Sequence, residues 1–200
     1  MSKRVLIIGA TGSIGQKLRK TLLEKTDYKL TLFSTRANTI RTVAQREIAV
    51  SGNVNNKNDL IKVINNQDVV FAALSGDLGT MAKNIVQVME SSPVRRLIFI
   101  SSMGIYNEIP RSIGGGNLNE NSMLRPYRQA ADVIEASSLD YTIIRPGWFD
   151  EGSDKYEVTR KGEAFKGHDV SRQAICNLVL KLIQQNGLGI RESLGINRPQ

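Results

Sequence analysis

An apolar run that ends in three evenly spaced glycines constrains the fold of this chain more than any other feature. Residues 4–8 read RVLII, and Gly9, Gly12 and Gly15 follow before a helical pattern begins. In such a segment the first glycine allows a tight turn, the second a close approach to a pyrophosphate, and the third close packing of helix on sheet. The segment therefore predicts a buried strand, a phosphate-binding turn and a helix.

The start of the predicted helix, residues 13–25, strengthens this interpretation. A helix N-terminus presents unpaired N–H groups and a partial positive charge to an anion. Thr11 and Ser13 add hydroxyl donors to the turn. The spacing is GxxGxxG and not the commoner GxGxxG, but its place between strand and helix favours a dinucleotide site over a turn that only needs positive φ. The predicted segment comprises Gly9, Thr11, Gly12, Ser13, Ile14 and Gly15.

Strand-like and helical patterns alternate along the rest of the chain. Strands are predicted over residues 4–8, 29–34, 46–50, 68–74, 96–101 and 140–145. Helices are predicted over residues 13–25, 57–64, 80–91, 126–137 and 170–185. Residues 107–123 are predicted as a loop, and the tail 188–200 as the place of a final strand. This order predicts an α/β fold, a Rossmann-type doubly wound parallel sheet in a single domain over residues 1–200.

The end of the second predicted strand indicates which nucleotide is bound. NAD-binding folds usually carry an acid about 20 residues past the glycines, where it bonds the ribose 2′-hydroxyl. This chain has no carboxylate there and has Arg36 instead, preceded by Ser34 and Thr35. Because arginine binds a phosphate bidentately, the position favours NADP(H) over NAD(H). Arg41 is a further candidate for the same phosphate.

Composition excludes several other classes of protein. Cys176 is the only cysteine and His168 the only histidine, so neither an internal disulfide nor a multi-histidine metal site is expected. The net charge is +8, but the basic residues are scattered, so no nucleic-acid partner is expected. No apolar run is long enough to span a bilayer. We expect a cytoplasmic protein without a membrane partner, either a monomer or a homodimer.

Several further segments resemble one family. The chain resembles the atypical short-chain dehydrogenases/reductases, specifically their small NAD(P)H-binding group with NmrA-like and flavin-reductase-like members. The resemblance rests on GATGSIG at 9–15, GNV at 52–54, AALSG at 72–76, FISSMGIY at 99–106, LDYTIIRPGWF at 139–149 and DVSRQAICNLVLKLI at 169–183. Together these segments cover nearly the whole chain.

The resemblance implies roles for residues beyond the glycine turn. Asn53 and Val54 would border the adenine, although family members often have Asp at the first of these positions. The ribose and pyrophosphate edge would be formed by Ala72, Ala73 and Leu74, and the surroundings of the nicotinamide by Ser101 and Ser102. The segment that closes over the nicotinamide would consist of Pro146, Gly147, Trp148 and Phe149.

The catalytic set of the wider family is incomplete in this chain. Short-chain dehydrogenases use a Ser, a Tyr as general acid and a Lys four residues after the Tyr, which a helix places on one face. Ser102 matches the serine. Tyr127 is the tyrosine on the corresponding helix, but Ala131 stands four residues later. In the other register Leu124 replaces the tyrosine, and Arg128 then faces Asp132.

Two functions remain compatible with this incomplete set. In the first, the protein is an NADPH-dependent reductase of a small conjugated acceptor such as a flavin or quinone, which takes its proton from water. In the second, it binds NADP(H) without turnover and reports redox state to a protein partner. A sugar-nucleotide epimerase is disfavoured, because only about fifty residues follow Arg145 where a substrate domain is needed.

Overall fold

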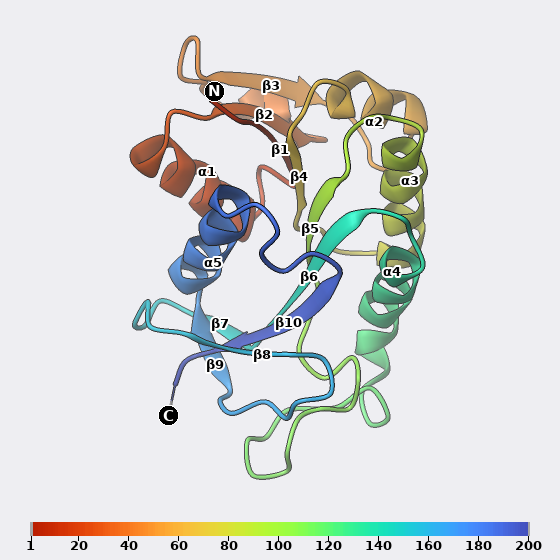
Figure 1. The fold of residues 1–200 in the computed structure, drawn as a ribbon, viewed down its shortest axis with the longest axis vertical. Coiled ribbons are helices and arrows are strands. Elements are labelled where there is room, and N and C mark those ends of the chain that lie inside the picture. The colour runs from red at the N-terminus through yellow and green to blue at the C-terminus, as the bar shows by residue number, and fades with distance from the viewer. Residues whose placement is uncertain (1, 200) are drawn as a thin grey trace.

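A computed structural model describes residues 2–199 as a single α/β unit built around one large sheet (Figure 1). The strands of this sheet are β1 (Arg4–Ile8), β2 (Lys29–Ser34), β3 (Glu47–Ser51), β4 (Val69–Ala72), β5 (Arg96–Ile100), β6 (Asp140–Pro146), β8 (Glu157–Thr159) and β10 (Glu192–Asn197). Their order is β3-β2-β1-β4-β5-β6-β10-β8. All neighbours are parallel except β10 and β8, which are antiparallel. The predicted Rossmann-type sheet is confirmed, with an antiparallel edge added.

Helices cover both faces of the sheet. They are α1 (Ser13–Lys25), α2 (Lys57–Ile64), α3 (Leu78–Glu90), α4 (Arg125–Glu135) and α5 (Arg172–Gln184), with short 3₁₀ turns at Ala37–Thr39 and Ser122–Leu124. Figure 1 shows α1 and α5 on one side of the sheet and α2, α3 and α4 on the other. Strand β1 contacts both helical layers. Val5 and Ile7 pack toward α1 and α5, whereas Leu6 and Ile8 pack toward α2, α3 and α4. An apolar run without alternation is what a strand covered on both faces requires.

The N-termini of the helices are satisfied in different ways. Asn56 caps α2, Asp77 caps α3 and Ser171 caps α5, each through a side-chain oxygen that accepts a backbone N–H. Helix α1 instead has Gly12, which has no side chain, as its N-cap, and its first turn contains no acidic residue. The first-turn N–H groups of a helix have no acceptor within the helix. Those of α1 are therefore left available on the sheet edge where β1 ends.

The sequence missed three short strands in the last third of the chain. Strand β7 (Trp148–Asp150) pairs in parallel with β9 (Asp169–Ser171) to form a second, two-stranded sheet, and β8 lies at the edge of the large sheet. Helix α5 starts at Arg172 and not at residue 170, because the residues before it belong to β9. Strand β6 runs through Pro146 and does not stop before it. Strands of three residues are too short to show a hydrophobic period.

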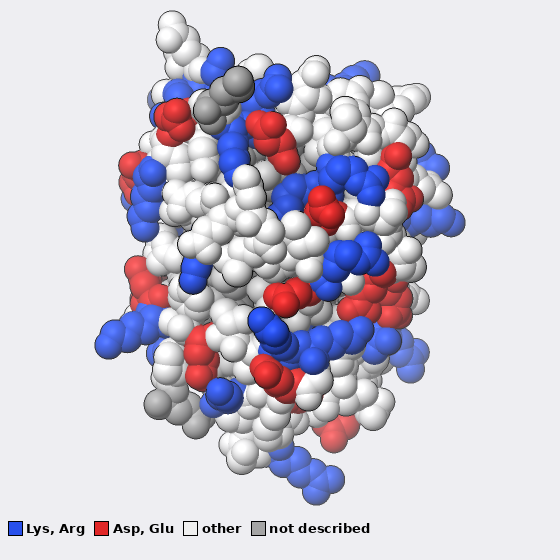
Figure 2. Space-filling model, in the orientation of Figure 1, with Lys and Arg blue, Asp and Glu red and all other residues white. Residues whose placement is uncertain are grey.

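The surface mixes the two signs of charge. Figure 2 shows Lys and Arg side chains interspersed with Asp and Glu over the face of the molecule that it draws. Several pairs form salt bridges, among them Lys161 with Glu135 and Arg172 with Glu151. Within residues 2–199, no helix is both long enough and apolar enough to cross a membrane.

Candidate functional site

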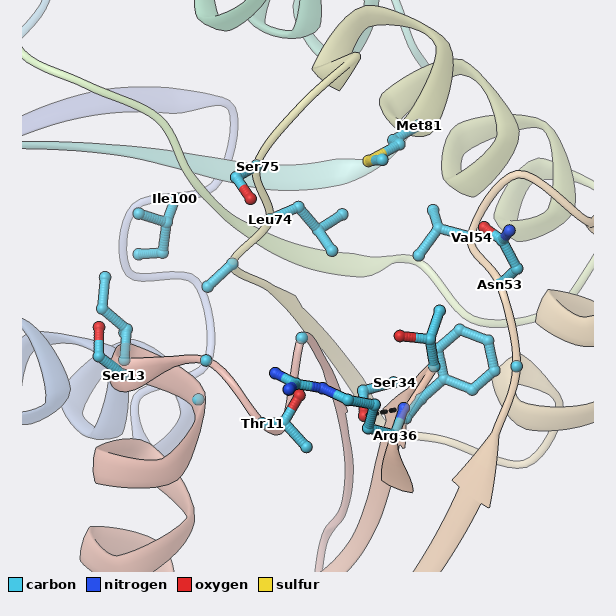
Figure 3. Close-up of a pocket in the computed structure, with 18 of the residues that line it drawn as sticks. Thr11, Ser13, Ser34, Arg36, Asn53, Val54, Leu74, Ser75, Met81 and Ile100 are labelled. Atoms are coloured by element: carbon cyan, nitrogen blue, oxygen red, sulfur yellow. Dashed lines mark hydrogen bonds between the residues drawn. The ribbon is translucent and has the colours of Figure 1, made fainter. Parts of the chain in front are cut away.

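A cavity of about 540 Å³ opens at the carboxyl ends of the central strands (Figure 3). It lies beside β1 and β4, where the strand order changes direction, which is where open α/β sheets bind their ligands. Its wall is formed by Gly9, Thr11, Gly12, Ser13, Ile14, Gly15, Phe33, Ser34, Thr35, Arg36, Gly52, Asn53, Val54, Ala73, Leu74, Ser75, Met81, Ile100, Ser101, Tyr127 and Phe149. The whole predicted glycine segment thus lies in one wall of the cavity.

Two of the three glycines are required by the packing of the turn itself. Gly9 has φ +87°, and a Cβ there would lie 2.1 Å from the carbonyl oxygen of Ala73. At Gly15 a Cβ would lie 2.3 Å from the carbonyl oxygen of Gly9. The amides of Gly9 and Ala10 both donate to the carbonyl of Phe33 in β2, which fixes the turn against the sheet. The turn is therefore held as a rigid backbone surface below the start of α1.

The start of α1 fits a diphosphate. Gly12 as N-cap leaves the first-turn amides uncovered by any side chain, and the helix dipole adds a partial positive charge. Thr11 and Ser13 flank this position in the cavity wall, as Figure 3 shows. Gln16 closes the turn from behind, since its Nε2 donates to the carbonyl of Thr11 at 2.6 Å.

Arg36 is the only charged residue in the cavity wall among the described residues. It follows β2 directly, and its backbone amide donates to Ser34 Oγ at 3.2 Å, a bond drawn in Figure 3. Its side chain is exposed. It also lines an adjoining hollow of about 360 Å³ with Arg19 and Arg41. Since none of the described residues that line either space is a carboxylate, this end of the cavity is suited to an additional phosphate.

The segment after β3 forms the neighbouring wall. Val54 is buried, and its carbonyl accepts a bond from Asn84 Nδ2 at 3.3 Å. The carbonyl oxygen of the Asn53 side chain accepts the amide of Asn55 at 2.9 Å, which closes a local turn. An aspartate at position 53 would support the same turn, so the asparagine keeps the backbone of this segment while it removes a negative charge from the wall.

The far end of the cavity brings together residues from three distant segments. Ser101 follows β5, Tyr127 lies in the first turn of α4, and Phe149 lies in β7. Phe149 is 42% exposed, with the Arg172 guanidinium 5.3 Å from its ring centroid. Neither Phe149 nor its neighbour Trp148 belongs to the core.

Five residues that the resemblance assigned to the site lie outside the cavity wall. They are Ala72, Ser102, Pro146, Gly147 and Trp148. The side chain of Ala72 is fully buried in the core. Trp148 is 63% exposed and stacks on His168, with ring centroids 5.8 Å apart and an interplanar angle of 8°. Alternation along β7 explains this difference, because neighbours in a strand point to opposite sides and Phe149 already faces the cavity.

Helix α4 does not reproduce the Tyr–Lys pair that the resemblance to short-chain dehydrogenases places on it, because it contains Tyr127 but no lysine. Leu124 and Ala131 are buried apolar residues, and Arg128 forms an ion pair with Asp132 at 2.7 Å. Within residues 2–199, no lysine lines the cavity. Tyr127 is thus the only phenol in the described wall, and it lacks a cationic neighbour four residues later.

Other titratable groups are placed away from the cavity wall. Tyr106 donates to Glu135 at 2.8 Å, and burial raises the pKa of its phenol above the ordinary value. Burial also raises the pKa of the Cys176 thiol, to about 12, as expected for an inert core cysteine. His168 bonds to Asp169 through Nδ1 at 2.6 Å and packs on Trp148. Among the described residues, no cluster of three or more His, Cys, Asp or Glu residues is suited to a metal ion.

Sequence reasoning missed part of the site. It did not single out Phe33, Gly52, Ser75, Met81 and Ile100 as wall residues. Their only signal is position, because each lies at or just beyond the carboxyl end of a strand, or in the first turns of the following helix. It also missed the buried ion pair between Arg145 and Glu108, which are 37 residues apart.

Comparisons with known proteins agree with this geometry. A family model described as NAD(P)H-binding matches residues 9–186. A short-chain dehydrogenase/reductase from Veillonella parvula DSM 2008, solved in complex with NADP, is 30% identical, with a TM-score of 0.90 over 100% of this chain and 96% of that one. A Rossmann-fold NAD(P)-binding family protein from Shigella flexneri is 36% identical, with a TM-score of 0.85 over 100% and 95%. The uncharacterized sugar epimerase YhfK from Bacillus subtilis (strain 168) is 24% identical over 211 residues, 94% of each chain.

Proposed function

The chain belongs to the NAD(P)H-binding family, and from this premise we propose that it binds NADP(H) and reduces a conjugated acceptor such as a flavin or a quinone. The observation that carries the cofactor choice is the charge of the cavity wall. Arg36 is the only charged residue that the described wall contains, and it stands where NAD-binding folds place an acid. The 30% identical Veillonella protein, whose complex contains NADP, supports the same choice.

Different residues along the cavity bind different parts of the cofactor. The turn Gly9–Gly15 and the first amides of α1 hold the diphosphate, Arg36 holds the 2′-phosphate, and Asn53 with Val54 borders the adenine. Ser101, Tyr127 and Phe149 line the reacting end. When bound, NADPH supplies the hydride.

The acceptor class follows from the missing acid. Reduction of an ordinary carbonyl requires a positioned proton donor, and neither Leu124 nor the Tyr127–Ala131 pair reproduces the Tyr–Lys arrangement. A conjugated acceptor spreads the charge of the added hydride and takes its proton from water. Position and cofactor chemistry are then sufficient for turnover.

A second candidate is a non-catalytic sensor that reports NADP(H) binding to a protein partner. It is favoured by the incomplete Ser–Tyr–Lys set. It is also favoured by the exposure of two large apolar side chains, Met123 at 79% and Trp148 at 63%. Sugar epimerisation is not proposed, because the relative with that name is 24% identical and its own activity is uncharacterized.

The deciding experiment follows the absorbance of reduced nicotinamide while purified protein is mixed with NADPH and a panel of acceptors. The panel contains riboflavin, FMN, menadione and a simple aldehyde. The reductase predicts turnover with a flavin or the quinone and none with the aldehyde. Saturable NADPH binding without turnover on any member would support the sensor instead.

A further inference from the structure

A second cavity, of about 460 Å³, lies at the opposite edge of the sheet, where the central strands begin. The neighbouring strands β1, β4, β5 and β6 each bring their first residue, or the residue just before it, to this edge. In sheet order the side chains at these positions are Lys3, Asp68, Arg96 and Asp140, and all four line the cavity. Charges of alternating sign thus follow one another along its wall. No described residue lines both this cavity and the proposed cofactor site.

These four charges are not neutralised by one another. Within residues 2–199, none of the four side chains takes part in a salt bridge. Arg96 and Asp140 are direct partners in the register of β5 and β6, yet Arg96 donates to the backbone carbonyl of Asp140 and not to its carboxylate. Charged groups that converge on a cavity without pairing to each other are suited to fix the orientation of a ligand.

The guanidinium of Arg96 is held in a defined position and still has free donors. Its Nη1 donates to the carbonyl of Asp140 at 2.9 Å and to Thr142 Oγ1 at 2.8 Å, and its Nη2 donates to the carbonyl of Leu188 at 3.1 Å. A guanidinium has five N–H donors, so Nε and the second hydrogen of Nη2 have no acceptor in the described chain. Burial lowers the pKa of Arg96 to about 10, as expected for a cation without a close counter-charge.

The ammonium group of Lys3 is held in a similar way at the end of α5. Its Nζ donates to the carbonyl of Ile183 at 2.5 Å and to Asn186 Oδ1 at 3.1 Å. Both acceptors are neutral, and one of the three ammonium donors remains. Lys3 and Arg96 therefore present two positive charges whose own hydrogen bonds go to neutral oxygens.

The two aspartates keep acceptor capacity. Asp68 Oδ2 accepts the backbone amide of Arg4 at 2.7 Å, and Asp68 Oδ1 accepts no bond from the protein within residues 2–199. The carboxylate of Asp140 likewise accepts no hydrogen bond from the described residues, since the bond from Arg96 ends on its backbone. An ionised carboxylate accepts hydrogen bonds at both oxygens, so each aspartate has room for a donor from a ligand.

The remaining wall of the cavity is partly apolar. Val69, Leu182 and Ile183 are buried, whereas Ile190 is 37% exposed. These side chains come from the start of β4, the end of α5 and the loop that follows α5. They offer contact for an aliphatic group beside the charged row.

The combination of charges indicates the class of ligand. A purely anionic ligand would be repelled by Asp68 and Asp140, and a purely cationic one by Lys3 and Arg96. A ligand that carries both charges is complementary to both pairs. We propose that this cavity binds a small zwitterion with an apolar part, such as a free aliphatic amino acid. Lys3 and Arg96 bind its carboxylate, the two aspartates bind its ammonium group, and the apolar wall contacts its side chain.

The test is an NMR titration of the full chain at neutral pH with leucine and two analogues. Isocaproate lacks the ammonium group of leucine, and isoamylamine lacks the carboxylate. The backbone amides of Val69 and Ile190 report binding in this cavity, and those of Gly9 and Gly12 report binding at the glycine turn. Leucine should bind about 10- to 100-fold more tightly than either analogue, the usual value of a charged hydrogen-bonded group.

Two variants assign the charges. Lys3→Met should lower leucine affinity about 10-fold. Lys29→Met is the matched control, because it removes the same charge from the start of β2, outside the cavity, and it should change leucine affinity by less than about twofold. Asp68→Asn keeps an acceptor for the Arg4 amide but loses a negative charge. It should reduce the preference for leucine over isocaproate about 5- to 10-fold, a change that a merely weakened fold would not produce.

Four results would overturn the inference. They are the absence of saturable shifts with leucine, equal affinities for leucine and the two analogues, shifts confined to the glycine turn, and equal losses in Lys3→Met and Lys29→Met. If Lys3→Met did not fold, the change of preference in Asp68→Asn would decide alone. Because the two cavities share no described residue, a titration with NADPH tests the proposed cofactor site separately.

Discussion

The two ends of the cavity are built on different principles. At the diphosphate end, the residues come from two short continuous stretches, the turn Gly9–Gly15 and the end of β2 with Arg36. At the far end, Ser101, Tyr127 and Phe149 come from three segments that only the folded sheet brings together. In the proposed site, backbone groups would do most of the binding at the first end, and side chains at the second. The local sequence is enough to specify the end with the glycine turn, whereas the end with Ser101, Tyr127 and Phe149 depends on tertiary packing.

An ion pair connects to each end, and the two pairs differ in how completely the arginine is enclosed. Arg19, paired with Glu47, lines the hollow beside Arg36 and donates to the carbonyl of Arg41. Arg19 bonds to both carboxylate oxygens of Glu47 at 2.6 Å, and its own side chain stays 23% exposed. Arg145 is fully enclosed with Glu108 and also donates to Ser193. A charge left behind costs more where water cannot reach it. The far end should therefore depend more on its pair than the diphosphate end does.

The largest expected effect is the loss of the far-end pair. Arg145→Met leaves Glu108 buried without its cation and should lower the free energy of unfolding by about 3–5 kcal/mol. Arg19→Met is the matched substitution at the other end. It should cost less, because Arg19 is itself 23% exposed and its removal opens a path for water to Glu47, whereas Arg145 is fully enclosed and also loses its bonds to Ser193. Urea unfolding measures the free energy of unfolding of both variants. Equal losses of stability would contradict the proposed difference between the two ends.

The second effect concerns the backbone of the turn. Gly9→Ala adds a Cβ 2.1 Å from the Ala73 carbonyl oxygen to a backbone with φ +87°. Strain and overpacking together should cost about 2–4 kcal/mol and displace the turn, so that NADPH affinity falls too. Gly162→Ala is the control, since its φ is +91° but nothing lies within 4 Å. It should show only the strain, about 1 kcal/mol, and unchanged NADPH affinity. Matching losses in the two variants would show that the close approach is unimportant.

The third effect concerns discrimination between cofactors. Arg36→Gln removes the only charge in the described cavity wall and should weaken NADPH binding about 10- to 100-fold, as expected for charged hydrogen bonds. NADH binding should not change, because NADH has no 2′-phosphate. Arg41→Gln, in the adjoining hollow, should have a smaller effect on NADPH. Parallel losses for NADPH and NADH in Arg36→Gln would contradict a phosphate role.

The smallest effect is a change in acid stability at the diphosphate end. Burial alone would raise the pKa of Glu47, but hydrogen bonds from Arg19 and the Val43 amide hold it below its ordinary value. Its contribution to stability is therefore present above the pKa of the unfolded chain and is lost as pH falls through the lower folded value. Glu47→Gln should flatten the acid side of a plot of unfolding free energy against pH. An unchanged slope would mean that protonation of Glu47 does not contribute to the pH dependence of stability.

Much of the fold was predictable because its signals are local. The bounds of β1, α1, β2 and α2 agree with the sequence patterns, and the glycine turn lies where its spacing predicts. β-branched and apolar runs with clear breaks specify such elements without knowledge of their partners. The short strands β7, β8 and β9 carry no such pattern, and their pairing depends on partners at a distance along the chain, because β7 pairs with β9 and β8 with β10.

The far end of the site was less predictable for the same reason. The motif places the catalytic serine of the family at Ser102, but in the structure Ser101 lines the cavity and Ser102 Oγ donates to the carbonyl of Met103. Likewise Trp148 and Phe149 are neighbours in one strand, and the direction of the strand decides which faces the cavity. Arg145 stands in an apolar strand without any sign of Glu108, its distant partner.

The central claim is that the turn Gly9–Gly15 and Arg36 form an NADP(H) site. Calorimetric titration of the wild-type protein with NADPH and, in parallel, with NADH tests it most directly. The account predicts saturable binding of NADPH at one site per chain and weaker binding of NADH. Absence of saturable heat with either dinucleotide would contradict it, and tighter binding of NADH would overturn the role of Arg36.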